Sequence, residues 1–347
     1  MRHEPLICRE KLEHLLRQFS GLTIGVVGDL FLDRYLEIAP GLHELSVETQ
    51  LEAYQVSRVR NAPGALGTVI SNLAALDVGQ IVPVTVLGDD GHGYDLRQQL
   101  SRLAVDTSSI ISDPKRLTPT YTKPLKQDAA GNWCELNRLD VRTRGPLPEK
   151  TCQQVCQRLK QVHALADGLI VLDQVNEEDW GVVNGTVRHC LGELFKSNPD
   201  KLIMIDSRQF LSRFDFGVLK GNGSEITRAA GITNPGRHAA IDAAQKLSRR
   251  TRNTVYCTLG GEGILVTRPG QNDEKVPGYP PPGSVDTVGA GDSATSGIVA
   301  SRLAGANEVE AAVVGNLVAS VTVQQLETTG VADPVQVLSR WEQVSMR

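Results

Sequence analysis

Asp286-Thr287-Val288-Gly289-Ala290-Gly291-Asp292-Ser293 joins a proline-rich loop, residues 279–283, to a predicted helix that begins near Ala294. Its two glycines let the backbone turn tightly, so that successive N–H groups converge at the helix N-terminus. These unsatisfied amides and the positive end of the helix dipole predict a concave anion site. Such a site suits the negative charge that develops on a phosphoryl group during transfer.

Asp292 directly follows the glycines, and we expect its carboxylate at the mouth of the anion site. There it would accept the proton of an alcohol that attacks the phosphoryl group. We also expect the amides and the helix dipole to keep this carboxylate ionised at neutral pH. The alternative interpretation is that Asp292 only caps the helix, as aspartate often does.

Upstream of this stretch, short apolar runs alternate with amphipathic segments. Apolar residues recur at helical spacing over 12–19 and 66–76, and buried strands are predicted at 22–27, 81–87 and 169–172. This alternation predicts an α/β fold with a mainly parallel central sheet that helices cover on both faces.

Two segments break this rhythm, and both have the alternating pattern of strands. They are residues 34–62 and 118–139, the second with a predicted hairpin turn at 128–132. We expect these segments to form a small β-lid that projects from a single domain of residues 1–347.

Composition narrows the class of partner. The chain has 36 Lys and Arg against 40 Asp and Glu, a net charge of −4, and its basic residues are scattered. This distribution argues against binding to nucleic acid or an anionic membrane. No apolar run reaches the roughly 18 residues of a membrane span, and residues 1–10 lack a signal-peptide core. The sequence therefore predicts a cytoplasmic protein that binds a small molecule.

The six cysteines include no Cys-x-x-Cys pair, which argues against a zinc site or a disulfide framework. Cys152 and Cys156, at i, i+4 on a predicted helix, could pair with another group, but we expect them to be buried, reduced thiols.

The stretch from Asp286 to Ser293 resembles the signature of the ribokinase-like (PfkB) carbohydrate kinases. The resemblance implies a three-layer sandwich in which Asp292 is the catalytic base and the amides of Gly289, Ala290 and Gly291 form the anion hole. It also implies ATP as phosphoryl donor, with Mg²⁺.

Further motifs of this family occur in the expected order. Asn222-Gly223-Ser224-Glu225 resembles its Asn-x-x-Glu, which implies that Glu225 helps bind Mg²⁺ through water; without the family, the same residues fit a helix cap equally well. The run from Thr258 through Gly260 to Gly263 is similar to the family's nucleotide-binding turn. Asn316 lies in the segment that resembles the helix bordering the adenine in family members. Asp286, with the loop near Thr329, resembles a site for an activating monovalent cation, K⁺ in many members.

Gly28-Asp29-Leu30-Phe31-Leu32-Asp33 is similar to the segment whose aspartate accepts hydrogen bonds from sugar hydroxyls. Because this segment follows the first strand, we expect Asp33 at the carboxyl end of the sheet. The sugar-site loop departs from the family pattern in Pro63-Gly64-Ala65-Leu66-Gly67-Thr68. Gly64 is retained, but Ala65 replaces a glycine and Thr68 replaces an asparagine that contacts sugar, so the sugar itself stays open.

Within the family, the chain most resembles the bacterial heptose-phosphate kinases. The resemblance rests on Gly-Asp-x-x-x-Asp-Arg-Tyr, on Asn137-Arg138-Leu139-Asp140, and on Asp206 followed by Arg208. Lys123, Arg138 and Arg208 would suit a phosphate group on the acceptor. Some such kinases carry a nucleotidyltransferase domain, which we do not expect here because the chain has no His-x-Gly-His. The family also implies a homodimer formed through the lid.

We therefore predict an ATP-dependent phosphotransferase acting on a hydroxyl of a sugar or sugar phosphate. The altered loop from Gly64 to Thr68 leaves a non-catalytic sugar or nucleotide sensor, or a scaffold on the kinase fold, as the alternative. A dinucleotide-dependent oxidoreductase is disfavoured, because no Gly-x-Gly-x-x-Gly follows the first strand.

Overall fold

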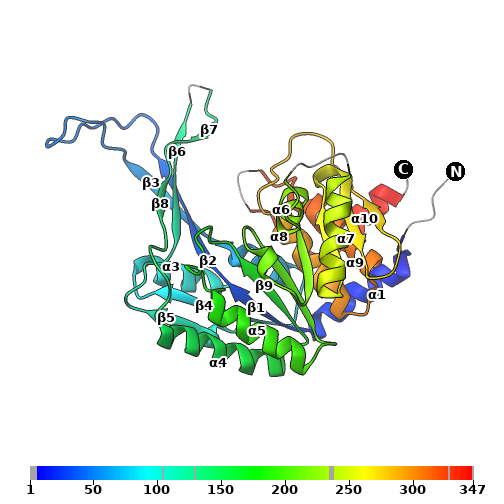
Figure 1. Ribbon diagram of the computed structural model, residues 1–347. Helices are drawn as coiled ribbons and strands as arrows, with labels where there is room; N and C mark the ends of the chain where they lie inside the picture. Colours follow the sequence, from blue (N-terminus) through cyan, green and yellow to red (C-terminus); the bar gives the residue numbers. More distant parts are fainter. Residues whose placement is uncertain (1–5, 104, 129, 234–237, 327–328, 346–347) are drawn as a thin grey trace.

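The computed structural model describes residues 6–103, 105–128, 130–233, 238–326 and 329–345. Its centre is a nine-stranded sheet (Figure 1) with the order β14-β13-β12-β11-β10-β9-β1-β4-β5. In that order the strands are Glu274–Pro277, Gly263–Thr267, Val255–Thr258, Val218–Asn222, Leu202–Ser207, Gly168–Asp173, Thr23–Gly28, Gln80–Gly88 and Ile110–Asp113. Neighbouring strands are parallel except at β12/β13 and β13/β14. The predicted mainly parallel sheet is confirmed.

Helices cover both faces of this sheet. One face carries α1 Arg9–Gln18, α2 Leu66–Ala75, α3 Gly91–Leu100, α8 Ala290–Leu303, α9 Glu308–Thr322 and α10 Pro334–Ser345. The other carries α4 Glu149–Leu165, α5 Gly185–Ser197, α6 Gly223–Ala229 and α7 Ala239–Thr251. Short 3₁₀ turns also connect elements in the described part of the chain: η1 Phe19–Gly21, η2 Thr107–Ser109, η3 Leu211–Arg213 and η4 Gly260–Glu262. The three-layer ribokinase-like sandwich is confirmed.

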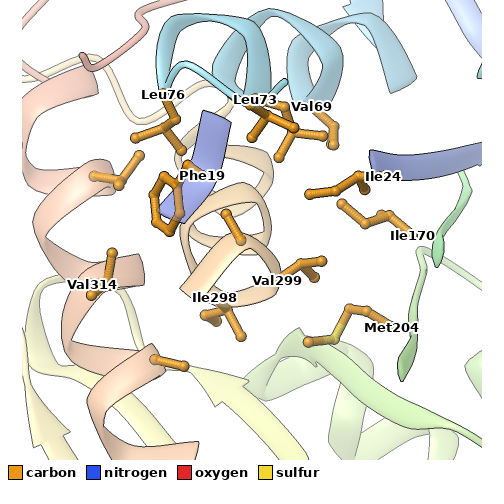
Figure 2. Close-up of a cluster of buried hydrophobic side chains, with 14 of the residues drawn as sticks. Phe19, Ile24, Val69, Leu73, Leu76, Ile170, Met204, Ile298, Val299 and Val314 are labelled. Atoms are coloured by element: carbon orange, nitrogen blue, oxygen red, sulfur yellow. The ribbon is translucent and has the colours of Figure 1, made fainter. Parts of the chain in front are cut away.

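Alternate strand side chains supply the two cores between these layers. In β9, Ile170 and Leu172 join one core, whereas Leu169 and Val171 join the other. Figure 2 shows part of the first core, in which side chains of α2, α8 and α9 meet Phe19 and the strand residue Ile24. Burying this apolar surface from both sides is what holds the sheet and its helices together.

A second sheet stands away from the helical layers (Figure 1) and is called the lid below. It comprises β2 Leu30–Ile38, β3 Val56–Ala65, β6 Thr120–Gln127, β7 Trp133–Glu135 and β8 Leu139–Val141, in the order β3-β2-β6-β7, with β8 paired to β6. The ranges 34–62 and 118–139 supply its strands in part, because residues 39–55 are the β2–β3 connection of the lid, with the isolated bridge Leu45 to Glu52, and not the predicted strand. At the β6–β7 turn the Asp128 amide donates to the Asn132 carbonyl over 2.9 Å, while Ala129 lies outside the described residues.

The lid begins earlier than its predicted boundary at residue 34, so that it includes Asp33. The chain leaves the central sheet at Gly28, whose φ of +151° and approach to the Leu172 carbonyl leave no room for a side chain. Asp33 lies within β2, paired with β3 and β6. Asp33 is thus held by the lid rather than by a strand of the central sheet, and the lid strand β2 starts directly after the carboxyl end of β1.

The cysteines divide by location. Cys152, Cys190 and Cys257 are buried, whereas Cys8 and Cys134 are exposed. The prediction of a buried thiol is confirmed for Cys152, and Cys156 is only partly buried. Within the described part of the chain, no helix has the length and apolar character needed to cross a membrane.

Candidate active site

Gly289, Ala290 and Gly291, called the anion loop below, form the start of α8. Gly289 is the residue before the helix, with φ +79°, a left-handed conformation that favours glycine. A Cβ atom here would lie 2.9 Å from Thr329 Cγ2 and 3.2 Å from Thr68 Cγ2, so a side chain would not fit. The amide of Ala290 donates to the Thr287 carbonyl over 3.2 Å, whereas those of Gly291 and Asp292 have no partner within a regular helix.

Asp292 lies in the first turn of α8. Burial, reinforced by the nearby Asp206 carboxylate and opposed by Lys220, raises the pKa of Asp292 to about 7. The expectation that this carboxylate is fully ionised at neutral pH is therefore wrong. Loss of hydration and neighbouring negative charge outweigh the stabilising effect of the helix N-terminus.

Lys220 and Asp206 form a buried ion pair beside Asp292 that sequence reasoning missed. The two residues are register partners on the parallel strands β11 and β10. Lys220 Nζ lies 2.7 Å from Asp206 Oδ2, and each side chain is 5% exposed. The same Nζ lies 3.0 Å from where a Cβ of Gly291 would stand, which places the ammonium against the anion loop. Burial alone would lower the pKa of Lys220, but the adjacent carboxylates raise it, so the ammonium stays charged.

Asn222 and Glu225 form a capping box at the start of α6. Asn222 Oδ1 accepts from the amide of Glu225 over 3.0 Å, and Glu225 Oε2 accepts from the amide of Asn222 over 2.8 Å. This is the capping arrangement considered as the alternative to a metal role. Burial, with a contribution from Asp206, raises the pKa of Glu225.

The charges around Lys220 test whether Mg²⁺ would fit. Over the residues that the structure describes, no three His, Cys, Asp or Glu side chains are grouped to bind a metal directly. Asp206, Glu225 and Asp292 nevertheless surround a single ammonium closely enough to influence its pKa. This excess of negative charge fits a Mg²⁺ ion that keeps several of its own waters and is bound together with a nucleotide.

The predicted nucleotide-binding residues lie along the next strands. Thr258 is the register partner of Asn222, and its hydroxyl donates to the Gly221 carbonyl over 3.4 Å. Gly260, with φ +59°, opens the η4 turn. Gly263, with φ +102°, lies where a Cβ would collide with the Val276 carbonyl. Asn316 Nδ2 donates to that same carbonyl and to the Pro277 carbonyl, tying α9 to β14.

Asp286 lies just before the anion loop. Its amide donates to the Val323 carbonyl over 2.9 Å, and its Oδ1 accepts from the Val288 amide over 2.9 Å. The methyl of Thr329 lies next to Gly289, whereas the adjoining Thr328 is outside the described residues. Both parts of the predicted cation site that are described thus flank the anion loop.

On the lid, the structure brings Asp33, Gly64 and Lys123 together. Lys123 Nζ lies 3.1 Å from Asp33 Oδ1, with the two side chains 15% and 12% exposed. A Cβ on Gly64 would lie 2.4 Å from Asp33 Oδ2, so only glycine admits this carboxylate. Lys123 also donates to the Tyr35 hydroxyl over 3.2 Å. Asp33 is the main partner that raises the pKa of Lys123 against the opposing effect of burial.

The other predicted acceptor residues have different surroundings. Arg138 forms a bidentate pair with Asp140, at 2.6 and 3.0 Å, and its guanidinium lies 4.3 Å from the centre of the Tyr121 ring. Arg208 is exposed after β10 and close enough to Asp292 to favour its ionised form. Thr68 is buried in the first turn of α2, against the anion loop.

Known proteins are similar to this chain in sequence, and others are similar in architecture. The bifunctional protein HldE of Caulobacter sp. (strain K31) is 29% identical over 92% of this chain, and that of Trichlorobacter lovleyi is 27% identical over 95%. The chain spans 63% and 65% of the lengths of these two relatives.

Solved structures of low identity share the fold. Arabidopsis thaliana ribokinase complexed with ribose and ATP has a TM-score of 0.65 at 18% identity, covering 92% of this chain and 98% of its own. Escherichia coli phosphofructokinase-2 in complex with potassium has a TM-score of 0.70 at 17% identity, covering 93% and 99%. The family model described as pfkB family carbohydrate kinase matches residues 43–334. With the anion loop, Asp292 and the three-layer sandwich in place, this match shows that the chain belongs to the pfkB family of carbohydrate kinases.

Proposed function

We propose that the chain transfers the γ-phosphoryl group of ATP to a hydroxyl of a sugar or sugar phosphate. One observation carries this proposal: a carboxylate with a pKa of about 7, Asp292, stands at the start of α8 beside the anion loop and the buried ammonium of Lys220. A proton acceptor, amide donors and a fixed positive charge in one place are what phosphoryl transfer to an alcohol requires.

In this proposal each residue has one task. Asp292 takes the proton of the acceptor hydroxyl. The hydroxyl oxygen then bonds to the γ-phosphorus of ATP, and the bond between that phosphorus and the departing ADP breaks. The amides of the anion loop and Lys220 stabilise the negative charge on the phosphoryl oxygens. A bound Mg²⁺ would neutralise phosphate charge, and Glu225 would hold one of its waters. Asp206 keeps Lys220 charged and in position.

Residues of the lid are proposed to select the acceptor. Asp33, which Gly64 admits and Lys123 orients, would accept hydrogen bonds from sugar hydroxyls. Lys123 and Arg138 of the lid, together with Arg208 after β10 of the central sheet, would bind a phosphate on the acceptor. The resemblance to the bacterial heptose-phosphate kinases, together with the similarity to the HldE proteins, supports a sugar phosphate as the acceptor class.

Three features of the assembled enzyme complete the proposal. The lid exposes Leu45, Val47 and Leu51, and this apolar surface supports a homodimer through the lid. Asp286 and the loop at Thr329 would bind K⁺, as the potassium complex of the phosphofructokinase-2 suggests by analogy. Use of ATP is consistent with a cytoplasmic enzyme.

Replacement of Asp292 tests the proposal. ADP release would be measured with Mg-ATP and K⁺ across a panel of sugars and sugar phosphates, for the wild type and for Asp292→Asn. We expect acceptor-dependent turnover that falls by about 10³-fold in the variant, because a positioned general base contributes about 10²- to 10⁴-fold.

Asp173→Asn is the matched control, because Asp173 is also a buried carboxyl whose pKa burial raises to about 7. Its carboxyl accepts from the Ser207 hydroxyl over 2.7 Å, and neither Asp292 nor Lys220 is among the groups that shift its pKa, so its variant should keep turnover. A wild type that binds Mg-ATP but turns over no acceptor would contradict the proposal and support the sensor alternative.

A further inference from the structure

Thr68 stands at the junction between the lid and the anion loop. The lid strand β3 ends at Ala65 and α2 begins at Leu66, so Thr68 is one turn away from Gly64, the residue against Asp33. Its side chain is 4% exposed. The residue is therefore packed inside the protein, next to both halves of the proposed site.

The γ-methyl of Thr68 is directed at the anion loop. Of the described atoms outside the adjacent chain, two come within 4 Å of the point where a Gly289 Cβ would stand: Thr329 Cγ2 at 2.9 Å and Thr68 Cγ2 at 3.2 Å. Gly289 holds a left-handed backbone at φ +79° and has no side chain of its own to fix it. The two methyl groups are what limits its movement on that side.

Hydrogen bonds tie the same three segments together. Asn72, one turn after Thr68, donates from Nδ2 to the Thr68 carbonyl over 3.0 Å and to the Gly330 carbonyl over 3.4 Å. Ser296 of α8 donates to the Val69 carbonyl of α2 over 3.3 Å. The helix α2, the loop at Thr329 and the start of α8 thus form one connected unit, with Gly289 at its centre.

We propose that Thr68 is a positioning residue: its γ-methyl, together with that of Thr329, holds Gly289 and thereby the amides of the anion loop. The inference rests on the proposed phosphotransferase function and deepens it. It assigns the role of Thr68 to its methyl group rather than to a hydrogen bond from its hydroxyl to the acceptor. Since α2 continues from lid strand β3, a movement of the lid would move Thr68 and, through this contact, Gly289.

Two substitutions separate the methyl from the hydroxyl. Thr68→Ser removes Cγ2 and keeps the hydroxyl, whereas Thr68→Val keeps Cγ2 and replaces the hydroxyl. We expect Thr68→Ser to lower kcat about tenfold while the acceptor KM changes by less than about twofold, because small displacements of catalytic groups affect the transition state most. Thr68→Val should recover kcat to at least about threefold above the serine variant. Thr329→Ser should lower kcat in the same way as Thr68→Ser.

Thr251→Ser is the matched control for losing a buried threonine methyl. Thr251 is also 4% exposed and helical, at the end of α7 on the opposite face of the sheet. Its variant should lower Tm by an amount similar to Thr68→Ser and leave kcat unchanged. A kcat loss of the same size at Thr251 would overturn the positioning role.

The remaining outcomes are distinct. If the serine variant matches the wild type while Thr68→Val raises the acceptor KM about tenfold, the hydroxyl binds the acceptor and the inference is wrong. An unchanged kcat in Thr329→Ser would also contradict it. Absence of turnover in the wild type with every acceptor would instead remove the proposed function, and the inference with it.

Discussion

The phosphoryl side and the acceptor side of the proposed site differ in the kind of chemical group that forms them and in how deeply those groups are buried. Around the anion loop, the groups are backbone amides at the start of a helix and an ion pair with both side chains 5% exposed. On the lid, the groups are side chains of β2 and β6 and of the following segment, with exposures from 12% at Asp33 to 40% at Arg138.

The difference indicates a division of labour between a rigid part and an adjustable part. Backbone amides and buried charges are hard to rearrange, because moving them would leave polar groups without partners. The more exposed side chains of the lid, such as Arg138, can be exchanged at little cost to stability. We therefore expect changes on the phosphoryl side to alter kcat, and changes on the lid to alter the acceptor KM.

After Asp292→Asn, the largest effect is expected for Lys220→Met. Loss of the ammonium beside the anion loop should lower kcat by about 10²- to 10³-fold, as for loss of a transition-state donor. It also leaves Asp206 buried without its partner, which should destabilise the protein by about 3–5 kcal/mol. Steady-state kinetics and urea unfolding measure the two effects separately.

The double variant Lys220→Met/Asp206→Asn is the control for folding. It should recover part of the lost stability, because no uncompensated charge remains at that position, but it should not recover kcat. Recovery of kcat along with stability would show that the ion pair is only structural.

A smaller effect, confined to binding, is expected for Lys123→Met. The variant keeps the length of the side chain but removes the charge that pairs with Asp33. The acceptor KM should rise about tenfold or more, with kcat changed by less than about threefold. Arg58→Met is the matched control, because Arg58 lies on β3 and its side chain is 67% exposed. A large fall in kcat for Lys123→Met would contradict the expectation that changes on the lid alter mainly the acceptor KM.

The pH dependence should report Asp292. Because the pKa of this carboxyl is raised to about 7, it is protonated below that pH and cannot accept a proton. The acceptor kcat/KM, measured at Mg-ATP well below its KM, should therefore fall about tenfold per pH unit below about 7 and level off above it. Asp173 has a similar pKa, so this limb must persist in Asp173→Asn. Its disappearance there would assign the titration to Asp173.

The smallest effect is on stability alone. Ala65 joins the lid to α2 with φ +53° and ψ −115°, a conformation unfavourable for alanine. Ala65→Gly should relieve this strain and stabilise the protein by about 1 kcal/mol in urea unfolding. Ala74→Gly, within the same helix, should instead destabilise it by about 1 kcal/mol. Destabilisation by both would mean that Ala65 is not strained.

The sequence was sufficient for features that follow local rules. Alternating apolar segments indicated the parallel sheet and its two helical layers, because strand and helix periodicity is written in neighbouring residues. The glycines before Asp292 predicted a tight turn into a helix, and Gly289 does hold a left-handed conformation directly before α8. The sequence allowed two interpretations of Asn222 and Glu225, a helix cap or a Mg²⁺ site. The structure contains the capping geometry.

Tertiary structure alone decided where charges meet and how strongly they are buried. The sequence does show two charged residues, Lys220 and Asp206, within otherwise apolar strands. Their contact could not be predicted from it, because the contact depends on the pairing of β10 with β11. The pKa of Asp292 follows from desolvation by the whole fold, which no local pattern contains. Likewise, Asp33 reaches Lys123, and Thr68 reaches Gly289, only because distant segments pack together. Local sequence sets which groups the chain offers, and the packing of distant segments sets their neighbours and their protonation.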